Sequence, residues 1–232
     1  ANAEIKQQKL IRNSFIVGFI LLLVLALFVL KSYIAKRNHN DELAFKNSQI
    51  SKQKQLVDEK QKEILDSITY AKRLQSAILP PNDFVQKHLS KFFIYYQPKD
   101  IVAGDFYWAE KVEDKFFIAA ADSTGHGVPG AMVSVVCSNA LNRAIKEFKL
   151  TDTGKILDKT RELVLETFEK SASEVKDGMD ISLLCIDSKN QSIFWSGANN
   201  PLWYIQDAEL KEIKADKQPI GKTDSPKPLT TH

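Results

Sequence analysis

Two aspartates occur where apolar runs meet glycine. Asp122 stands between "FFIAAA" and "STGHGVPG", and Asp105 follows a glycine in "VAGDFYW". Residues 105–112 and 115–122 have the composition of strands, and the short polar "EDK" between them predicts a hairpin. If that hairpin turns at residues 113 and 114, position 105 lies opposite position 122. The sequence therefore predicts two carboxylates that face each other across one ladder.

Opposed carboxylates of this kind indicate a divalent-cation site. Like charges on facing strands repel, and a bound cation or a shared proton offsets that cost. Carboxylate oxygens suit Mg²⁺ or Mn²⁺, whereas zinc favours histidine and cysteine. The nearby His126 lies between two glycines, so we interpret it as a turn residue rather than a ligand. An ordinary turn or helix-cap role for Asp122 is the alternative at this point.

The other reactive side chains nearby favour structural interpretations. Ser123 and Thr124 have no histidine and acid in a recognisable triad, so a nucleophilic serine is not expected. Asp177 and Asp180 in "DGMD" could add to a metal site, although an Asp-Gly pair also makes an ordinary turn.

From about residue 83 the sequence has the pattern of a compact domain. Besides the hairpin, strands are predicted at "KFFIYYQP", "MDISLLCID", "SIFWSGAN" and "PLWYIQD", the last three as an antiparallel meander. Helices are predicted at 128–148 and 154–171, the second with an apolar face of Ile156, Leu157, Leu163, Val164 and Phe168. Trp195 and Trp203 are expected in the core. Strands, two helices and then strands predict a layered α+β fold without a strand-helix-strand unit.

The N-terminal part predicts a membrane anchor. Residues 14–30 carry no charge, and we expect a juxtamembrane segment at 1–13 and a transmembrane helix at 14–35. A cleaved signal peptide is the competing interpretation, but no small-residue cleavage site follows. Basic residues flank the span on both sides, so charge does not indicate its orientation.

Residues 36–80 predict a linker helix with coiled-coil character. Apolar residues recur at an interval of seven, at Leu43, Ile50, Val57, Ile64, Ala71 and Ile78. The second core position of each heptad is mostly polar, so a coil here would be thin. The pattern favours a parallel homodimer, with a single amphipathic helix lying on the following domain as the alternative.

Composition excludes one class of partner and suggests a compartment. Lys plus Arg number 32 against 29 Asp plus Glu, so nothing indicates binding of nucleic acid. Cys137 and Cys185 both lie in apolar runs, which predicts buried free thiols and suits a reducing compartment. The chain begins with Ala and ends in "KPLTTH", so we expect it to be a piece of a longer protein.

Four motifs in order resemble one family. "YAKRLQSAILPP", "VAGDFYW", "AADSTGHGVPGAMVS" and "SGANNPLW" with "QPIG" are similar to the SpoIIE-like branch of the metal-dependent PPM (type 2C-like) serine/threonine phosphatases. The resemblance implies an antiparallel β-sandwich flanked by helices that holds two Mn²⁺ or Mg²⁺ ions. It implies Asp105, Asp122 and the main-chain carbonyl of Ser123 as metal ligands. It also implies a phosphate-facing site loop of Gly104, Gly125, His126 and Gly127.

The same resemblance implies a function. Water activated by the two ions is the nucleophile, so no side chain is assigned as catalytic. The expected substrate is a phosphorylated regulator of the anti-sigma-factor antagonist type, and the domain at 83–232 is expected in the cytoplasm, below a single span of the inner membrane. The family's two later aspartates, in "TDG"-like and "DD-x-T"-like motifs, are absent, so we expect the C-terminal part of the domain to be missing. Without these late metal ligands, activity is expected of the complete domain and not necessarily of this chain alone. A catalytically silent adaptor that binds a phosphoregulator is the alternative function.

Overall fold

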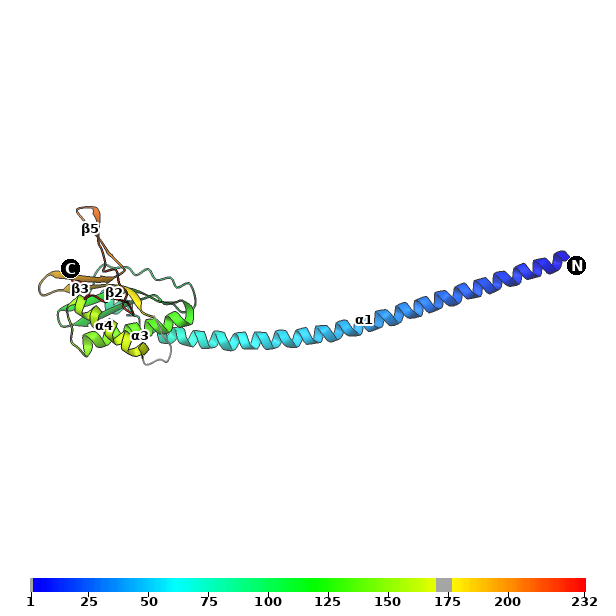
Figure 1. The fold of residues 1–232 in the computed structure, drawn as a ribbon, viewed down its shortest axis with the longest axis horizontal. Helices are drawn as coiled ribbons and strands as arrows, with labels where there is room; N and C mark the ends of the chain where they lie inside the picture. The colour runs from blue at the N-terminus through cyan, green and yellow to red at the C-terminus, as the bar shows by residue number, and fades with distance from the viewer. Residues whose placement is uncertain (1, 170–176) are drawn as a thin grey trace. The chain divides into compact units, whose positions relative to one another are not determined.

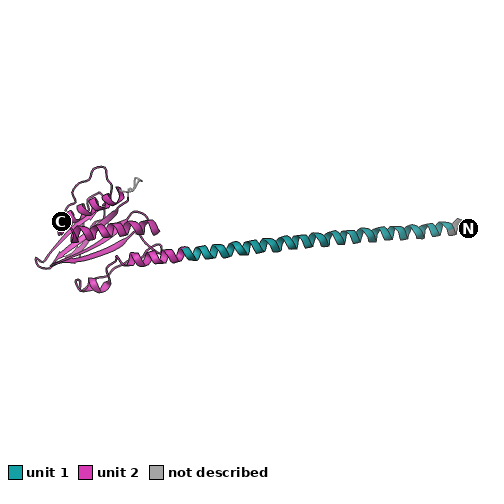
Figure 2. Ribbon diagram, turned by 90° about the horizontal axis from the view of Figure 1, so that it is seen from below, with its two compact units in different colours: residues 1–63 teal, residues 64–232 magenta. Residues whose placement is uncertain are grey.

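The protein, seen here as a computed structural model, is described for residues 2–169 and 177–232. It divides into two compact units, residues 1–63 and 64–232, which Figure 2 distinguishes by colour. The end of the helix predicted at 154–171 falls partly on residues 170 and 171, outside the described residues.

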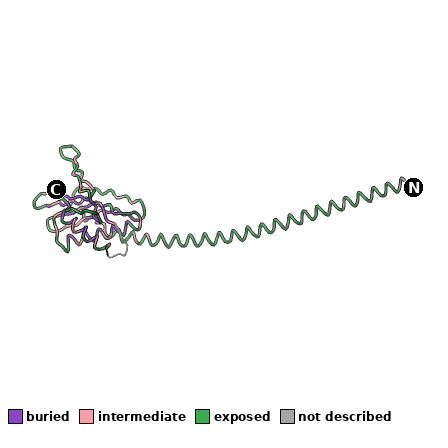
Figure 3. The backbone as a smooth tube through the Cα atoms, in the orientation of Figure 1, coloured by how far each residue is buried: buried purple, intermediate pink, exposed green. Residues whose placement is uncertain are grey.

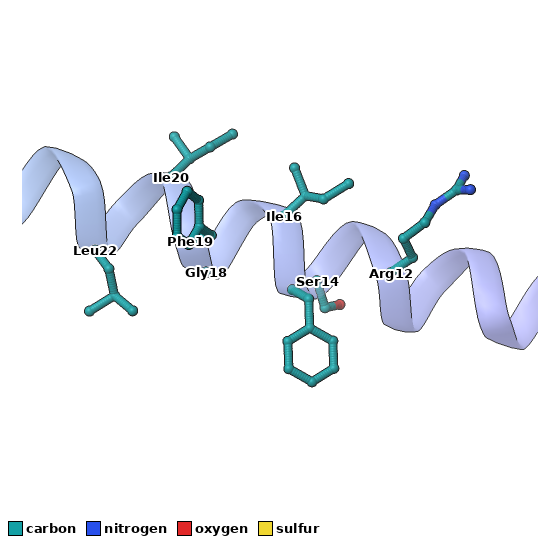
Figure 4. A pocket seen from close by; sticks show the side chains of 8 residues that line it. Arg12, Ser14, Ile16, Gly18, Phe19, Ile20 and Leu22 are labelled. Carbon is teal, nitrogen blue, oxygen red and sulfur yellow. The ribbon is translucent and has the colours of Figure 1, made fainter.

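The first unit consists of the N-terminal part of one continuous helix, α1 (Asn2–Ser76). Its most apolar 18-residue window has a mean hydropathy of 2.8, so the helix is long and apolar enough to cross a membrane. Figure 3 shows this stretch as exposed, and in Figure 4 Ile16 and Ile20 stand on one side of the helix and Leu22 on the other. An apolar surface of this kind on all sides is typical of a helix in contact with lipid.

Four heptad positions of α1 lie at the surface, and Ala71 is half-buried. Leu43, Ile50, Val57 and Ile64 are all exposed, and the last member of the series, Ile78, lies beyond the end of the helix. The coiled coil therefore stays a prediction. Leu79, which follows α1 and belongs to the second unit, packs against the hydrophobic core of that unit.

The second unit is built around one antiparallel sheet. Its strands are β1 (Phe106–Val112), β2 (Lys115–Ser123), β3 (Met179–Asp187) and β4 (Ser192–Ala198), in the order β1-β2-β3-β4. A short helix, α2 (Asn82–Gln86), precedes them. The helices α3 (Gly127–Lys146) and α4 (Thr153–Glu169) pack together, with α3 on β1 and β2 and α4 on β3 and β4 (Figure 2). The predicted hairpin, both helices and the α+β class are confirmed.

The core lies between the sheet and these two helices. Alternate residues of each strand point into it, as in the pairs Phe117 with Cys185 and Ala119 with Leu183. The helices contribute the buried side chains Val133, Cys137, Ala140, Leu141, Ala144, Ile145, Ile156, Leu157, Leu163 and Val164. Both cysteines are buried and unpaired, as predicted. Because side chains alternate, residues of opposite parity, including Asp122, lie on the helix-free face.

The strand predicted at residues 91–98 is wrong. This segment pairs with no strand in the described part of the chain, and the side chain of Phe93 is 90% exposed. It lies instead over the helix-free face, where it and Ile118 and Leu184 line a cavity of about 650 Å³. A segment placed across a sheet face cannot extend the ladder, which grows only at a sheet edge. The predicted sandwich of two sheets stays a prediction.

The predicted meander is wrong after β4. Strand β5 (Leu202–Gln206) pairs with a strand that was not expected, β6 (Glu209–Ile213), in a separate two-stranded sheet. Figure 1 shows this hairpin projecting away from the larger sheet. Trp195 is buried, at 2% exposure, but Trp203 on β5 is 66% exposed, so its predicted core position is also wrong. The turn at Asp207 and Ala208, both with positive φ, joins β5 to β6. The edge of β4 is bonded instead to His232, because Trp195 and His232 exchange main-chain hydrogen bonds of 2.9 and 2.8 Å.

Candidate metal centre

The hairpin register places Asp105 opposite Asp122. Phe106 pairs with Ala121 at the end of the ladder, so the next position joins the two aspartates. Burial raises the pKa of Asp122, and hydrogen bonding and repulsion from the Asp105 carboxylate raise it further. The geometry expected from the sequence is therefore present, and the two carboxylates interact directly.

A third aspartate lies at the same level of the sheet. Asp122 pairs with Asp180 in the ladder between β2 and β3, so the three neighbouring strands carry aspartate side by side. The Asp180 carboxylate accepts a hydrogen bond of 2.8 Å from the side-chain amide of Asn199. Across the described ranges 2–169 and 177–232, however, no three His, Cys, Asp or Glu side chains are arranged so that they could jointly hold a metal. The period-two pattern of β3 was the signal that could have aligned Asp180 with Asp122.

Asp177 has a different environment from Asp180. Its carboxylate accepts a hydrogen bond of 2.8 Å from the hydroxyl of Thr124. The amide N–H of Thr124 in turn donates to the carbonyl of Gly178 at 2.9 Å. These contacts join the segment after β2 to the segment before β3, which favours the structural interpretation of Asp177.

Main-chain packing brings the loops of the site together. A Cβ atom on Gly104 would lie 2.4 Å from the carbonyl oxygen of Gly125 and 2.8 Å from that of Ser123. A Cβ atom on Gly130 would also lie 2.4 Å from the Gly125 oxygen. The Ser123 hydroxyl donates a hydrogen bond of 2.6 Å to the carbonyl of Gly104. Only glycine permits this approach, and sequence reasoning missed the contribution of Gly130.

The remaining residues of the predicted site loop lie at the start of α3. Gly125 and Gly127 have φ of +87° and +61°, which favours glycine at both positions. His126 is the residue that precedes α3, and its Nδ1 atom lies 3.4 Å from a carboxylate oxygen of Asp100. This position agrees with the interpretation of His126 as a turn residue.

Gln75 was not identified from the sequence. Its side chain is 5% exposed, and its amide nitrogen donates to the carbonyl of Ala103 and, at 3.0 Å, to the hydroxyl of Ser134. Its amide oxygen accepts a hydrogen bond of 3.1 Å from the N–H of Ala103. The end of α1 is thereby bonded to the residue before Gly104, and to α3.

The oxygen atoms present suit a hard cation. Two carboxylates oppose each other without a basic partner in the contacts described above, and the carbonyl of Ser123 lies against Gly104 beside them. The raised pKa of Asp122 reflects the cost of bringing the two negative charges together. Mn²⁺ or Mg²⁺ would relieve that cost and prefers such oxygen donors. These residues therefore fit part of the coordination shell of such an ion.

Comparison with known proteins gives a consistent result. The family described as Stage II sporulation protein E (SpoIIE) matches residues 113–232. The SiaA-PP2C domain of Pseudomonas aeruginosa is 31% identical over 74% of this chain and 67% of that chain, with a TM-score of 0.64. The PP2C phosphatase domain of SpoIIE from Bacillus subtilis, with a fragment of its regulatory domain, is 17% identical over 56% of this chain and 38% of that one, with a TM-score of 0.45. No curated protein matches.

The family match covers the second strand of the hairpin, α3, α4 and the strands that follow. The likeness to the SiaA domain extends over most of the chain at an identity that indicates common descent. The motif around Asp122 lies inside the family match, whereas Asp105 lies before its first residue. The chain therefore belongs to the SpoIIE family of PPM-type serine/threonine phosphatase domains.

Proposed function

We propose that this protein is a membrane-anchored, metal-dependent phosphatase that hydrolyses phosphoserine or phosphothreonine in a bacterial regulatory protein. The observation that carries the proposal is the opposition of Asp105 and Asp122 at one end of the hairpin, beside the carbonyl of Ser123. Membership of a family of phosphatase domains supports the reaction class.

In this proposal Asp105, Asp122 and the carbonyl of Ser123 hold the ions. When bound, Mn²⁺ or Mg²⁺ supplies an activated water and neutralises charge on the phosphoryl oxygens. The protein contributes a rigid placement of the oxygen ligands, because Gly104 and Gly130 let the loops pack main chain against main chain. The Ser123 hydroxyl is bonded to the Gly104 carbonyl and acts as a structural group.

The parts outside the site complete the proposal. The apolar stretch of α1 anchors the protein by a single span in the cytoplasmic membrane, with the phosphatase domain in the cytoplasm. Residues 36–80 pair as a parallel coiled coil and make a homodimer, and this linker carries a signal to the metal site. The substrate is a phosphorylated regulator of the anti-sigma-factor antagonist type. A second antiparallel layer covers the helix-free face, which carries the apolar side chains of Ile118 and Leu184.

The test uses the complete gene product that contains this chain, in detergent micelles. Hydrolysis of a phosphoserine peptide is followed by phosphate release with added Mn²⁺, with excess chelator, and in the variant Asp122→Ala. We expect release that requires Mn²⁺ and is lost in Asp122→Ala, whereas Glu209→Ala, which removes an exposed carboxylate on β6, behaves as wild type.

Calorimetry with Mn²⁺ on the same samples separates the two candidate functions. Turnover that survives both the chelator and Asp122→Ala would overturn the metal assignment. Binding of Mn²⁺ and of phosphopeptide without any turnover would instead favour the silent adaptor. Circular dichroism of each variant verifies that the fold is retained.

A further inference from the structure

A second cavity opens on the polar side of the candidate metal centre. It has a volume of about 410 Å³ and is lined on one side by Asp122, Ser123, Thr124 and His126. Its lining also includes Asp180 of β3 and Pro219, Gly221 and Lys222, which belong to the segment that follows β6. A carboxylate that we assign to the metal and a lysine therefore line the same cavity.

The segment at 218–227 is closed at its base into a loop. Gln218 donates from its side-chain nitrogen to the carbonyl of Lys227 at 2.9 Å, and its side-chain oxygen accepts from the N–H of Lys227 at 3.0 Å. Arg161 of α4 donates 3.0 Å hydrogen bonds both to the Gln218 oxygen and to the carbonyl of Lys227. Both ends of the loop are thus bonded to one side chain.

The side chain that holds the loop is a buried charge. Arg161 is 8% exposed and is paired with Asp158 at 2.7 Å. Burying a guanidinium costs free energy that an ion pair only partly returns, so stability alone is a weak reason for this arrangement. The hydrogen bonds that Arg161 makes do, however, fix the position of the two ends of the loop.

The other side of the loop is joined to the strand that carries Asp180. Met179 and Ile220 exchange two main-chain hydrogen bonds, of 3.1 and 2.8 Å. A Cβ atom on Gly178 would lie 2.9 Å from the Cα of Gly221, so the two segments are in close main-chain contact. Hydrogen bonds from α4 and from β3 therefore fix the position of the loop. Lys222 lies two residues after Ile220, which makes the hydrogen bonds to β3.

We infer that this cavity binds the phosphoryl group of the phosphorylated polypeptide, that Lys222 pairs with its negative charge, and that Arg161 is a positioning residue for the loop. The inference rests on the proposed function, because the ligand is the substrate of the proposed reaction. The ammonium group of Lys222 would form a charge-assisted hydrogen bond with the phosphoryl dianion. Because the ends of the loop are already fixed by hydrogen bonds, less conformational entropy is lost when the ligand binds.

Binding of a phosphonate peptide tests the inference without turnover. The probe is a fluorescent peptide in which a methylene group replaces the ester oxygen of phosphoserine, and its twin carries plain serine. Fluorescence anisotropy of the full chain in detergent with Mn²⁺ gives the ratio of the two affinities. We expect Lys222→Gln to lower this ratio about tenfold. Lys222→Arg should retain most of it, because the charge is kept.

A matched control uses the same chain region. Lys217 is exposed and does not line the cavity, so Lys217→Gln should leave the ratio unchanged. Gln218→Met opens the loop base but keeps Lys222, and we expect it to lower the ratio as well. A ratio that is unchanged in Lys222→Gln, or a wild type that does not prefer the phosphonate peptide, overturns the inference.

Parallel turnover of an ordinary phosphoserine peptide separates the two proposals. Preferential binding that depends on Lys222, without turnover, contradicts the proposed phosphatase activity and supports the binding site. If the protein hydrolyses the peptide and Lys222→Gln leaves the ratio of the two affinities unchanged, the proposed phosphatase activity is supported and Lys222 does not recognise the phosphate.

Discussion

The side chain of Gln75 pairs with the main chain of Ala103 as one peptide group pairs with another, donating to its carbonyl and accepting from its N–H. Ala103 is buried and lies two residues before Asp105. The end of α1 therefore bears directly on the segment that carries one proposed metal ligand.

Replacing Gln75 by leucine should weaken both the fold and the metal site. The buried N–H and C=O of Ala103 would lose their partners, which costs about 1–3 kcal/mol of unfolding free energy. Urea unfolding measures this loss, and calorimetry with Mn²⁺ should show weaker binding because Asp105 is less firmly placed. Gln61→Leu changes an exposed position of α1 and serves as the control. Unchanged Mn²⁺ affinity in Gln75→Leu would limit Gln75 to a structural role.

Asp122→Asn should stabilise the metal-free protein at neutral pH. The pKa of Asp122 is raised in the folded state by burial and by Asp105, so folding favours its protonated form. This contribution is present below the ordinary aspartate pKa and is lost as the pH rises through the folded pKa. Without metal, the urea midpoint of unfolding of the wild type should fall as the pH rises through the folded-state pKa of Asp122, and that of Asp122→Asn should fall less. With added Mn²⁺ the wild type should become more stable than Asp122→Asn. If Mn²⁺ stabilises the variant as strongly as the wild type, Asp122 is not a metal ligand.

Gly130→Ala should disrupt the site although alanine is the better helix former. Helix propensity favours alanine over glycine by about 1 kcal/mol. The new Cβ, however, would lie 2.4 Å from the carbonyl oxygen of Gly125 and 3.0 Å from the Cα of Gly104, and both neighbours are main chain. We expect a lower melting temperature and weaker Mn²⁺ binding, whereas Val128→Ala, at an exposed position of α3, should change neither. A higher melting temperature in Gly130→Ala would mean that the main chain at Gly125 and Gly104 shifts to accommodate the new Cβ at little cost.

The two thiols should be inert in the folded protein. Burial, together with the negative charge of Asp177, raises the pKa of Cys137 to about 12, and burial raises that of Cys185 to about 11. Both thiols are therefore protonated at pH 8, and a thiol is a poor nucleophile. Mass spectrometry after iodoacetamide should detect alkylation only in denaturant. Because unfolding lets both thiols ionise, stability should fall as the pH rises above their ordinary pKa.

Local patterns were sufficient to predict the hairpin and the face of α4. The turn between Val112 and Lys115 sets the register of β1 on β2, so the opposition of Asp105 and Asp122 follows from counting residues. The apolar spacing in α4 likewise identified Ile156 and Leu157, which are buried. Both features depend on contacts whose periodicity is visible in a short stretch of sequence.

Features that depend on distant partners were not predictable in the same way. Residues 91–98 have the composition of a strand, but composition does not say whether a ladder partner exists. Gln75 is one polar residue among many in α1, and only its contact with Ala103 distinguishes it. The edge of β4 is bonded to His232, a partner far along the chain, and β5 pairs with β6 instead.

The length of the hairpin has a consequence for how this site tolerates insertions and deletions. Asp105 and Asp122 meet because equal numbers of residues separate them from the turn at Glu113 and Asp114. One residue inserted into either strand would move the side chains beyond the insertion to the other face of the sheet. One carboxylate would then point toward the helices, unless a β-bulge accommodated the extra residue. The turn itself can change length without moving either carboxylate as long as Val112 stays paired with Lys115, whereas the two strands can change length only together.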